Sequence, residues 1–235
     1  MPEQYNPNDD EDEVNYERNR HIIDCLVQQG YTPTLASKLL LSSSSSWSCQ
    51  SSRPLTIWIV DNSASMKIND GRKLINTKSQ YDVRVQSCTR WEELCETTTY
   101  HSQLSALLEI PTKFVLLNPP TTTTGSGTTR QEFSIAERGP EWIPDDLEDL
   151  MENFNRIEPS GVTPLTDHLR RAYDSLEYLS DSDDAKVVVV VATDGKPTDP
   201  SGLSSPDVDR DFELALRKVQ SRASFVVIRL CTNDD

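Results

Sequence analysis

Apolar and amphipathic stretches alternate along the chain from Leu55 to Leu230, and this pattern predicts the fold. Continuous apolar runs predict strands at 55–60, 113–117, 186–193 and 224–230, and a run alternating apolar with polar residues predicts an edge strand at 132–135. Apolar residues spaced by three and four predict helices at 82–109, 145–157, 165–179 and 206–222. The predicted fold class is therefore α/β, a doubly wound, mainly parallel sheet with helices on both faces.

The segment before the first strand differs in composition and predicts a separate organisation. Acidic residues crowd residues 1–18, which predicts a solvated, disordered tail. Two short helical patterns within residues 19–41 meet at Gly30-Tyr31-Thr32-Pro33 and predict a helical hairpin. Serine dominates residues 42–53, as in a linker, so the domain that contains the sheet spans residues 54–235.

Oxygen-bearing side chains collect where three of the predicted elements begin or end. Asp61, Ser63 and Ser65 follow the first strand, Asp194 follows the strand at 186–193, and Thr163 stands before a proline that opens a helix. Each feature alone also fits an ordinary helix cap or turn. In an open parallel sheet, however, sites form outside the carboxyl ends of the strands, where all three segments can meet. Carboxylate and hydroxyl oxygens suit Mg²⁺ or Mn²⁺, so the sequence predicts a divalent-cation site.

Three motifs make residues 55–231 resemble a von Willebrand factor type A domain, the integrin I-like family: Asp61-x-Ser63-x-Ser65, Gly161-Val-Thr163-Pro-Leu and Thr193-Asp194-Gly195. The resemblance implies a Rossmann-like sheet and a metal-ion-dependent adhesion site made by the five side chains above. It also implies an open coordination position for an acidic side chain of a protein partner, and a Thr163 that changes between direct and water-mediated contact. Ala64 replaces the usual glycine between the serines.

Members of this family usually add a strand and a helix beyond the point at which this sequence stops. We therefore expect the last strand and helix to be lacking and one sheet edge to be exposed.

Charge and cysteine usage narrow the function classes. The formal net charge is −15, from 38 acidic and 23 basic residues, and no basic stripe is visible, so nucleic-acid binding is disfavoured. The sequence has neither a run of about 18 apolar residues nor a signal peptide, which predicts no membrane span. Five scattered cysteines without an Asn-x-Ser/Thr sequon favour a cytoplasmic protein.

The predicted function is metal-dependent protein binding by a non-enzymatic domain, and other functions are compared with it. The main alternative is a scaffold or ubiquitin-linked adaptor that acts through the N-terminal helices, with a structural metal. A metal-dependent hydrolase is weaker: Ser63 stands where a phosphatase has its second Asp, and His168, expected near a helix surface, lacks a Gly-x-Ser-x-Gly partner motif. Zinc binding by Cys88, Cys95 and His101 is disfavoured because their spacing fits one face of a helix.

Overall fold

The computed structural model describes residues 7–28, 32–34, 36–37, 40, 54–76, 83–122, 130–179 and 186–232. The chain divides into two compact units, Met1–Ser52 and Arg53–Asp235, and each is described by itself. The predicted serine-rich linker at 42–53 lies outside the described residues.

The N-terminal unit contains the helix α1, Pro7–Gln28. It begins earlier than the apolar pattern predicts and includes most of the predicted acidic tail, of which residues 1–6 lie outside the described ranges. Proline at the start of a helix and acidic residues in its first turns are favourable, because proline lacks an N–H and the helix dipole attracts negative charge. Residues 33–34, 36–37 and 40 are helical, but their neighbours are not described, so the second helix of the hairpin stays a prediction.

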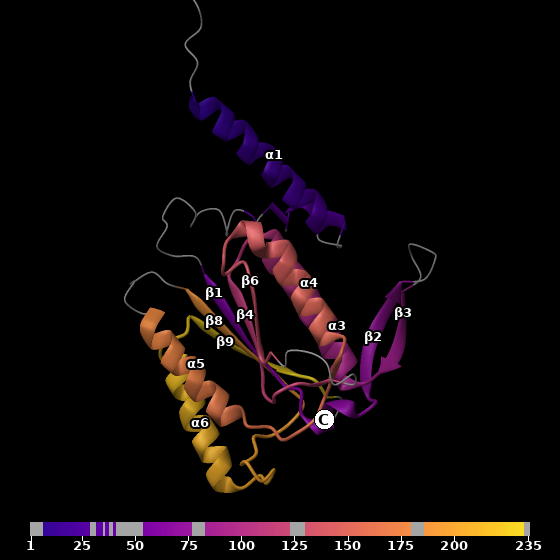
Figure 1. Ribbon diagram of the computed structural model, residues 1–235, viewed down its shortest axis with the longest axis vertical. Helices are drawn as coiled ribbons and strands as arrows, with labels where there is room; N and C mark the ends of the chain where they lie inside the picture. Colours follow the sequence, from indigo (N-terminus) through magenta and orange to yellow (C-terminus); the bar gives the residue numbers. More distant parts are fainter. Residues whose placement is uncertain are drawn as a thin grey trace, which may run out of the picture. The chain divides into compact units, whose positions relative to one another are not determined.

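Five strands form the main sheet in the described part of the second unit, in the order β6-β4-β1-β8-β9 (Figure 1). Their bounds are Leu55–Val60 for β1, Thr112–Leu116 for β4, Glu132–Ile135 for β6, Val187–Thr193 for β8 and Phe225–Leu230 for β9. β1, β4, β8 and β9 run parallel, and β6 pairs antiparallel with β4 at one edge. The predictions of a mainly parallel sheet and of an edge strand at 132–135 are confirmed.

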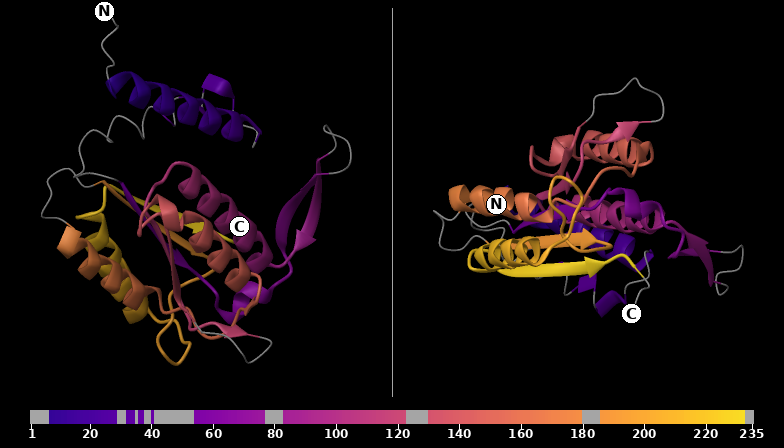
Figure 2. Two further views of the ribbon diagram at one scale, coloured as in Figure 1. Left: turned by 45° about the horizontal axis from the view of Figure 1, so that its top comes forward. Right: turned by 90° about the horizontal axis from the view of Figure 1, so that it is seen from below.

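In the part of the chain that the structure describes, helices cover both faces of this sheet (Figures 1 and 2). They are α3 (Arg90–Leu107), α4 (Ile143–Phe154), α5 (Leu165–Leu179) and α6 (Pro206–Gln220). On one face, Trp58, Phe114 and neighbouring side chains form a buried cluster with residues of α3 and α4. On the other face, Ile57, Ile59 and Val189 form a second buried cluster with residues of α5 and α6. The alternation of side chains along β1 therefore supplies both cores.

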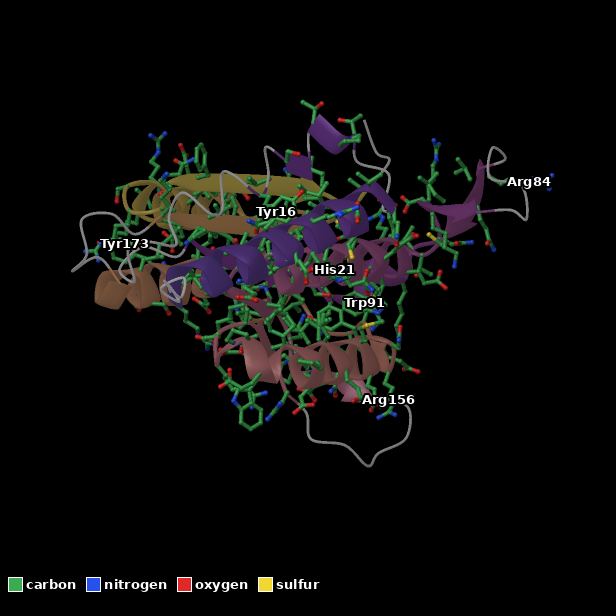
Figure 3. The ribbon with its side chains drawn as sticks, turned by 90° about the horizontal axis from the view of Figure 1, so that it is seen from above. Tyr16, His21, Arg84, Trp91, Arg156 and Tyr173 are labelled. Carbon is green, nitrogen blue, oxygen red and sulfur yellow. The ribbon has the colours of Figure 1, made fainter. Side chains whose placement is uncertain are left out.

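Aromatic packing fixes the start of α3, where a residue of the candidate site lies. The ring of Trp91 stacks on that of Phe154 in α4, with centroids 5.8 Å apart, and Phe154 meets Phe133 edge-on at 5.4 Å. Figure 3 shows Trp91 directed from α3 toward α4. Such pairs add about 0.5–1.5 kcal/mol beyond the area they bury, so they hold the neighbouring Arg90 in place.

The predicted helix at 82–109 is wrong in its first part. Residues Val83–Cys88 form β3, which pairs antiparallel with β2, Gly71–Asn76, in a hairpin that projects beside α3 (Figures 1 and 2). α3 begins at Arg90 because Thr89 caps it: the Thr89 hydroxyl accepts a hydrogen bond from the Glu92 N–H, and the Glu92 carboxylate accepts one from the Thr89 N–H. This reciprocal capping box is readable as Thr-x-x-Glu and marks the true start.

Smaller elements complete the second unit. They are the 3₁₀ turns η1 (Ala64–Lys67) and η2 (Pro140–Trp142) and the paired two-residue strands β5 (Thr121–Thr122) and β7 (Ile157–Glu158). β9 forms the edge opposite β6 in the described sheet and exposes Phe225, Val227, Ile228 and Leu230.

Candidate metal centre

Three loops that the sequence predicts to converge do lie together, at the carboxyl ends of β1 and β8. Three backbone hydrogen bonds join them: from Ser160 N to Asn62 O (2.7 Å), from Ala64 N to Gly161 O (3.2 Å) and from Thr198 N to Thr163 O (3.0 Å). Gly161 adopts φ +90°, and a Cβ atom there would meet the Asn118 side chain at 2.6 Å. Glycine is therefore required for this close approach of the loops.

Two asparagine side chains, Asn62 and Asn118, join the loops to one another by hydrogen bonds. The Asn62 amide donates to the Asn118 carbonyl at 3.0 Å and accepts from the Asn118 N–H at 2.8 Å. The Asn118 amide in turn donates to the Val162 carbonyl at 2.8 Å. The loop after β1, the segment after β4 and the loop before α5 are thus joined by side-chain hydrogen bonds that satisfy part-buried backbone groups.

Asp61 lies at the end of β1 and is fully buried. One carboxylate oxygen accepts a hydrogen bond from the Ser63 N–H at 2.8 Å, and the other accepts from the Thr193 hydroxyl at 2.6 Å. Burial raises the pKa of Asp61, these hydrogen bonds oppose the rise, and the negative charge of Asp194 adds to it. A buried carboxylate of this kind gains stability from a cation placed near it.

A chain of three oxygen atoms runs from the first loop to the third. The Ser63 and Ser65 hydroxyl oxygens are 3.0 Å apart, and the Ser65 hydroxyl donates to Asp194 Oδ1 at 2.9 Å. Two adjacent ligands of an octahedral Mg²⁺ ion, each about 2.1 Å from it, lie about 2.9–3.0 Å apart. The spacing and chemistry of these oxygen atoms therefore fit two successive edges of such an octahedron.

Asp194 also binds a buried arginine. Arg90 Nη1 lies 3.0 Å from Asp194 Oδ2, while Arg90 Nε and Nη2 donate to the two oxygens of Asp70 at 2.7 and 2.5 Å. The Asp70 hydrogen bond contributes most to raising the pKa of Arg90, and Arg90 lowers the pKa of Asp70. The candidate site thus contains a guanidinium that is held in place on two sides.

Four of the five predicted ligands, Asp61, Ser63, Ser65 and Asp194, belong to this hydrogen-bonded cluster. The fifth, Thr163, is buried, and the loop that carries it is held there through its backbone, whose N–H donates to the Thr198 hydroxyl at 3.0 Å. The backbone contacts of the loop thus bring Thr163 near the cluster, whereas its side chain makes none of the hydrogen bonds that join the other four residues.

Sequence reasoning missed four residues that build this site: Asn62, Arg90, Asn118 and Thr193. Asn62 and Thr193 stand inside the quoted motifs, and their buried positions beside Asp61 and Asp194 could have suggested a supporting role. Arg90 and Asn118 carry no local signal, because their contacts depend on how distant segments pack.

His168 is buried, so the prediction that it lies near the helix surface is wrong. Its Nε2 atom lies 2.9 Å from the Leu117 carbonyl oxygen, and desolvation lowers its pKa despite this hydrogen bond. The residue directly precedes Leu169 of α5, which belongs with Ala172 to the buried cluster between this helix and the sheet. His101 packs against the ring of Trp58 at 4.8 Å. Both histidines thus have structural partners.

The zinc alternative has no support in the part of the chain that the structure describes, where no three His, Cys, Asp or Glu side chains are grouped so that they could hold a metal ion. This is compatible with the site above, whose oxygen donors include hydroxyl groups. Within the same residues, the helices are too short or too polar to cross a bilayer. No protein-family model matches the chain, and no curated protein does.

Proposed function

We propose that this chain binds a divalent cation, Mg²⁺ or Mn²⁺, at the carboxyl ends of β1 and β8, and that it uses the ion to hold an acidic side chain of a protein partner. The observation that carries the proposal is the chain of Ser63, Ser65 and Asp194 oxygen atoms, spaced by 3.0 and 2.9 Å beside the buried Asp61. The likeness of the motifs to a von Willebrand factor type A domain supports the same proposal.

In this proposal Ser63, Ser65 and Asp194 hold the ion, with Asp61 and Thr163 close to it. Bound there, the ion supplies an electrophilic centre to which a carboxylate can be added. Asp61 keeps the first loop in place, because both of its oxygen atoms accept hydrogen bonds from the protein. Its role in a binding site is thus to orient the first loop and to balance the charge of the ion.

The surface around the loops suits an acidic partner. Ala64, Gly161 and Gly195 are exposed, and a Cβ atom placed on Gly195 would have no neighbouring atom within 4 Å. A partner side chain can therefore approach the loops closely. Lys67 and Lys196 are exposed in the first and third loops. On a chain with a net charge of −15, these lysines favour the local approach of a carboxylate.

The test is a calorimetric titration of MgCl₂ and MnCl₂ into chelator-treated protein. We expect saturable one-to-one binding by the wild type and its loss in Asp61→Asn, which keeps the size of the side chain and removes its charge. Asp199→Asn is the matched control, since Asp199 likewise accepts hydrogen bonds within a loop but is tied to Ser201 and Leu203. Its binding should equal that of the wild type.

The partner chemistry is tested by adding a Glu-containing peptide and its Gln counterpart to the Mg²⁺-loaded protein and following amide NMR signals. Shifts of Ser63 and Gly195 caused by the Glu peptide, and abolished by EDTA, are expected. A folded wild type that binds neither ion would refute the proposal. Equal responses to the two peptides would refute its acidic-partner part alone.

A further inference from the structure

Arg90 is an unusual neighbour for a cation site, because it places a fixed positive charge against one of the proposed ligands. Its side chain is 6% exposed, and its Nη1 atom is 3.0 Å from Asp194 Oδ2, whose side chain is 1% exposed. The opposite carboxylate oxygen, Asp194 Oδ1, receives the Ser65 hydroxyl. One carboxylate thus joins the arginine to the oxygen atoms that would hold the ion.

The guanidinium is held there by the hairpin side of the molecule. Asp70, directly before β2, accepts hydrogen bonds from the Arg90 side chain with both carboxylate oxygens. The backbone N–H of Arg90 donates to the Ile68 carbonyl at 3.0 Å. Gly71 follows, and a Cβ atom there would meet the Thr89 carbonyl oxygen at 2.6 Å. The arginine is therefore fixed by close packing and by a two-point ion pair, which limits its ability to move away from an incoming cation.

We propose that Arg90 is a built-in counter-ion that sets the affinity of the site for divalent cations, and that Asp70 tunes this effect by neutralising Arg90. The inference rests on the proposed function. Without a metal ion, Arg90 compensates the buried Asp194, whose charge would otherwise be costly. With the ion present, guanidinium and ion share one carboxylate and repel each other across it, so affinity is lower than the oxygen ligands alone would give.

Two substitutions should change the affinity in opposite directions. Arg90→Met keeps an unbranched apolar stem and removes the guanidinium charge, so Asp194, without its ion pair, attracts the ion more strongly. Asp70→Asn leaves Arg90 charged but removes its neutralising partner, so the repulsion increases. A merely structural role for the Asp70 and Arg90 pair predicts instead that both variants lose affinity together.

The experiment is a titration of MgCl₂ into the chelator-treated full chain by calorimetry, at about pH 8 so that the carboxylates are ionised. We expect Kd to fall at least tenfold in Arg90→Met and to rise severalfold in Asp70→Asn. Mg²⁺ should also raise the melting temperature of Arg90→Met more than that of the wild type. The control is Arg138→Met, which removes the ion pair of Arg138 with Asp146 and should leave Kd unchanged.

The outcomes separate this inference from the function on which it rests. If the wild type binds Mg²⁺ and a folded Arg90→Met binds it equally or more weakly, the counter-ion role is wrong and the metal site stands. Binding by Arg90→Met alone would support the repulsion by Arg90 but would refute the proposed function of the wild-type chain. If neither binds, both fail. Should Arg90→Met not fold, Asp70→Asn decides, and an unchanged or tighter Kd in that variant overturns the proposal.

Discussion

Asn62 offers a sharp test of how the loops of the candidate site are held. It is fully buried, and its amide exchanges two hydrogen bonds with the backbone of Asn118, donating at 3.0 Å and accepting at 2.8 Å. These bonds continue the pairing of β1 with β4 beyond the last residues of the two strands. Replacing Asn62 by Ala should therefore release the loop that carries Asp61 and Ser63.

The size of the effect follows from what the substitution leaves behind. It removes both partners of the part-buried Asn118 backbone groups, and each such group that is left without a hydrogen bond costs about 1–3 kcal/mol. Two such groups give about 2–6 kcal/mol, a large part of the 5–15 kcal/mol by which domains are commonly stable. Asp at position 62 should be no better, because it keeps the acceptor, loses the donor and adds a second buried charge beside Asp61.

Urea unfolding of chelator-treated protein, followed by far-UV circular dichroism, measures this loss. The control is Asn153→Ala, which also removes two side-chain hydrogen bonds, both to Asp149 one turn earlier in the half-buried part of α4. That helix position should cost about 1 kcal/mol or less, since the Asp149 side chain is 41% exposed and water can replace its lost partner. If Asn62→Ala costs no more than Asn153→Ala at equal m-values, the loops are not held in the manner argued here.

Two other substitutions test the surroundings of the site. Thr89→Ala should destabilise the protein by about 1 kcal/mol in urea, because it removes the hydroxyl that caps α3 at the Glu92 N–H, whereas Thr89→Ser should retain most of the stability; equal losses would contradict the cap. Burial lowers the pKa values of His168 and His101 in the folded protein. Just below pH 6.5 the unfolded chain therefore binds more protons than the folded one, so the free energy of unfolding is highest above that pH and falls as the pH is lowered. His168→Gln can still donate a hydrogen bond to Leu117 and should remove up to about 1.4 kcal/mol per pH unit of this slope, so that only the contribution of His101 remains. Urea unfolding at several pH values measures the slope, and a slope identical to that of the wild type would disprove the prediction.

Most strands and helices could be predicted because their apolar patterns are strong. Strands that are buried on both faces are apolar throughout, and helices that are buried on one face carry one apolar stripe. β8 is a nearly pure run of valine, buried on both faces, and α5 begins and ends at the predicted residues since its stripe of leucines faces the sheet. The hairpin β2–β3 escaped prediction for the opposite reason. Its cross-strand pair Leu74 and Val85 is exposed, so apolar residues there do not mark a core and happen to continue the helical spacing of α3.

The candidate ligands could be found because each stands next to the end of a strand or the start of a helix, where local sequence and topology together fix its place. Arg90 could not, since its bond to Asp194 joins residues 104 positions apart. The contact exists because α3 packs with Trp91 against α4 and because the hairpin brings Asp70 to the start of that helix. No periodicity or short motif encodes such a meeting of three segments.

The charge of the cluster gives a further argument for a divalent ion. Asp61, Asp70 and Asp194 contribute three negative charges to the hydrogen-bonded group and Arg90 contributes one positive charge, while the serine hydroxyls contribute none. These four described side chains together thus carry two negative charges when ionised, which a dication balances and a monovalent ion does not. Removing Arg90 raises the deficit to three and removing Asp70 lowers it to one. The opposite shifts in Mg²⁺ affinity expected for these two variants therefore follow from the same count that favours Mg²⁺ over a monovalent ion.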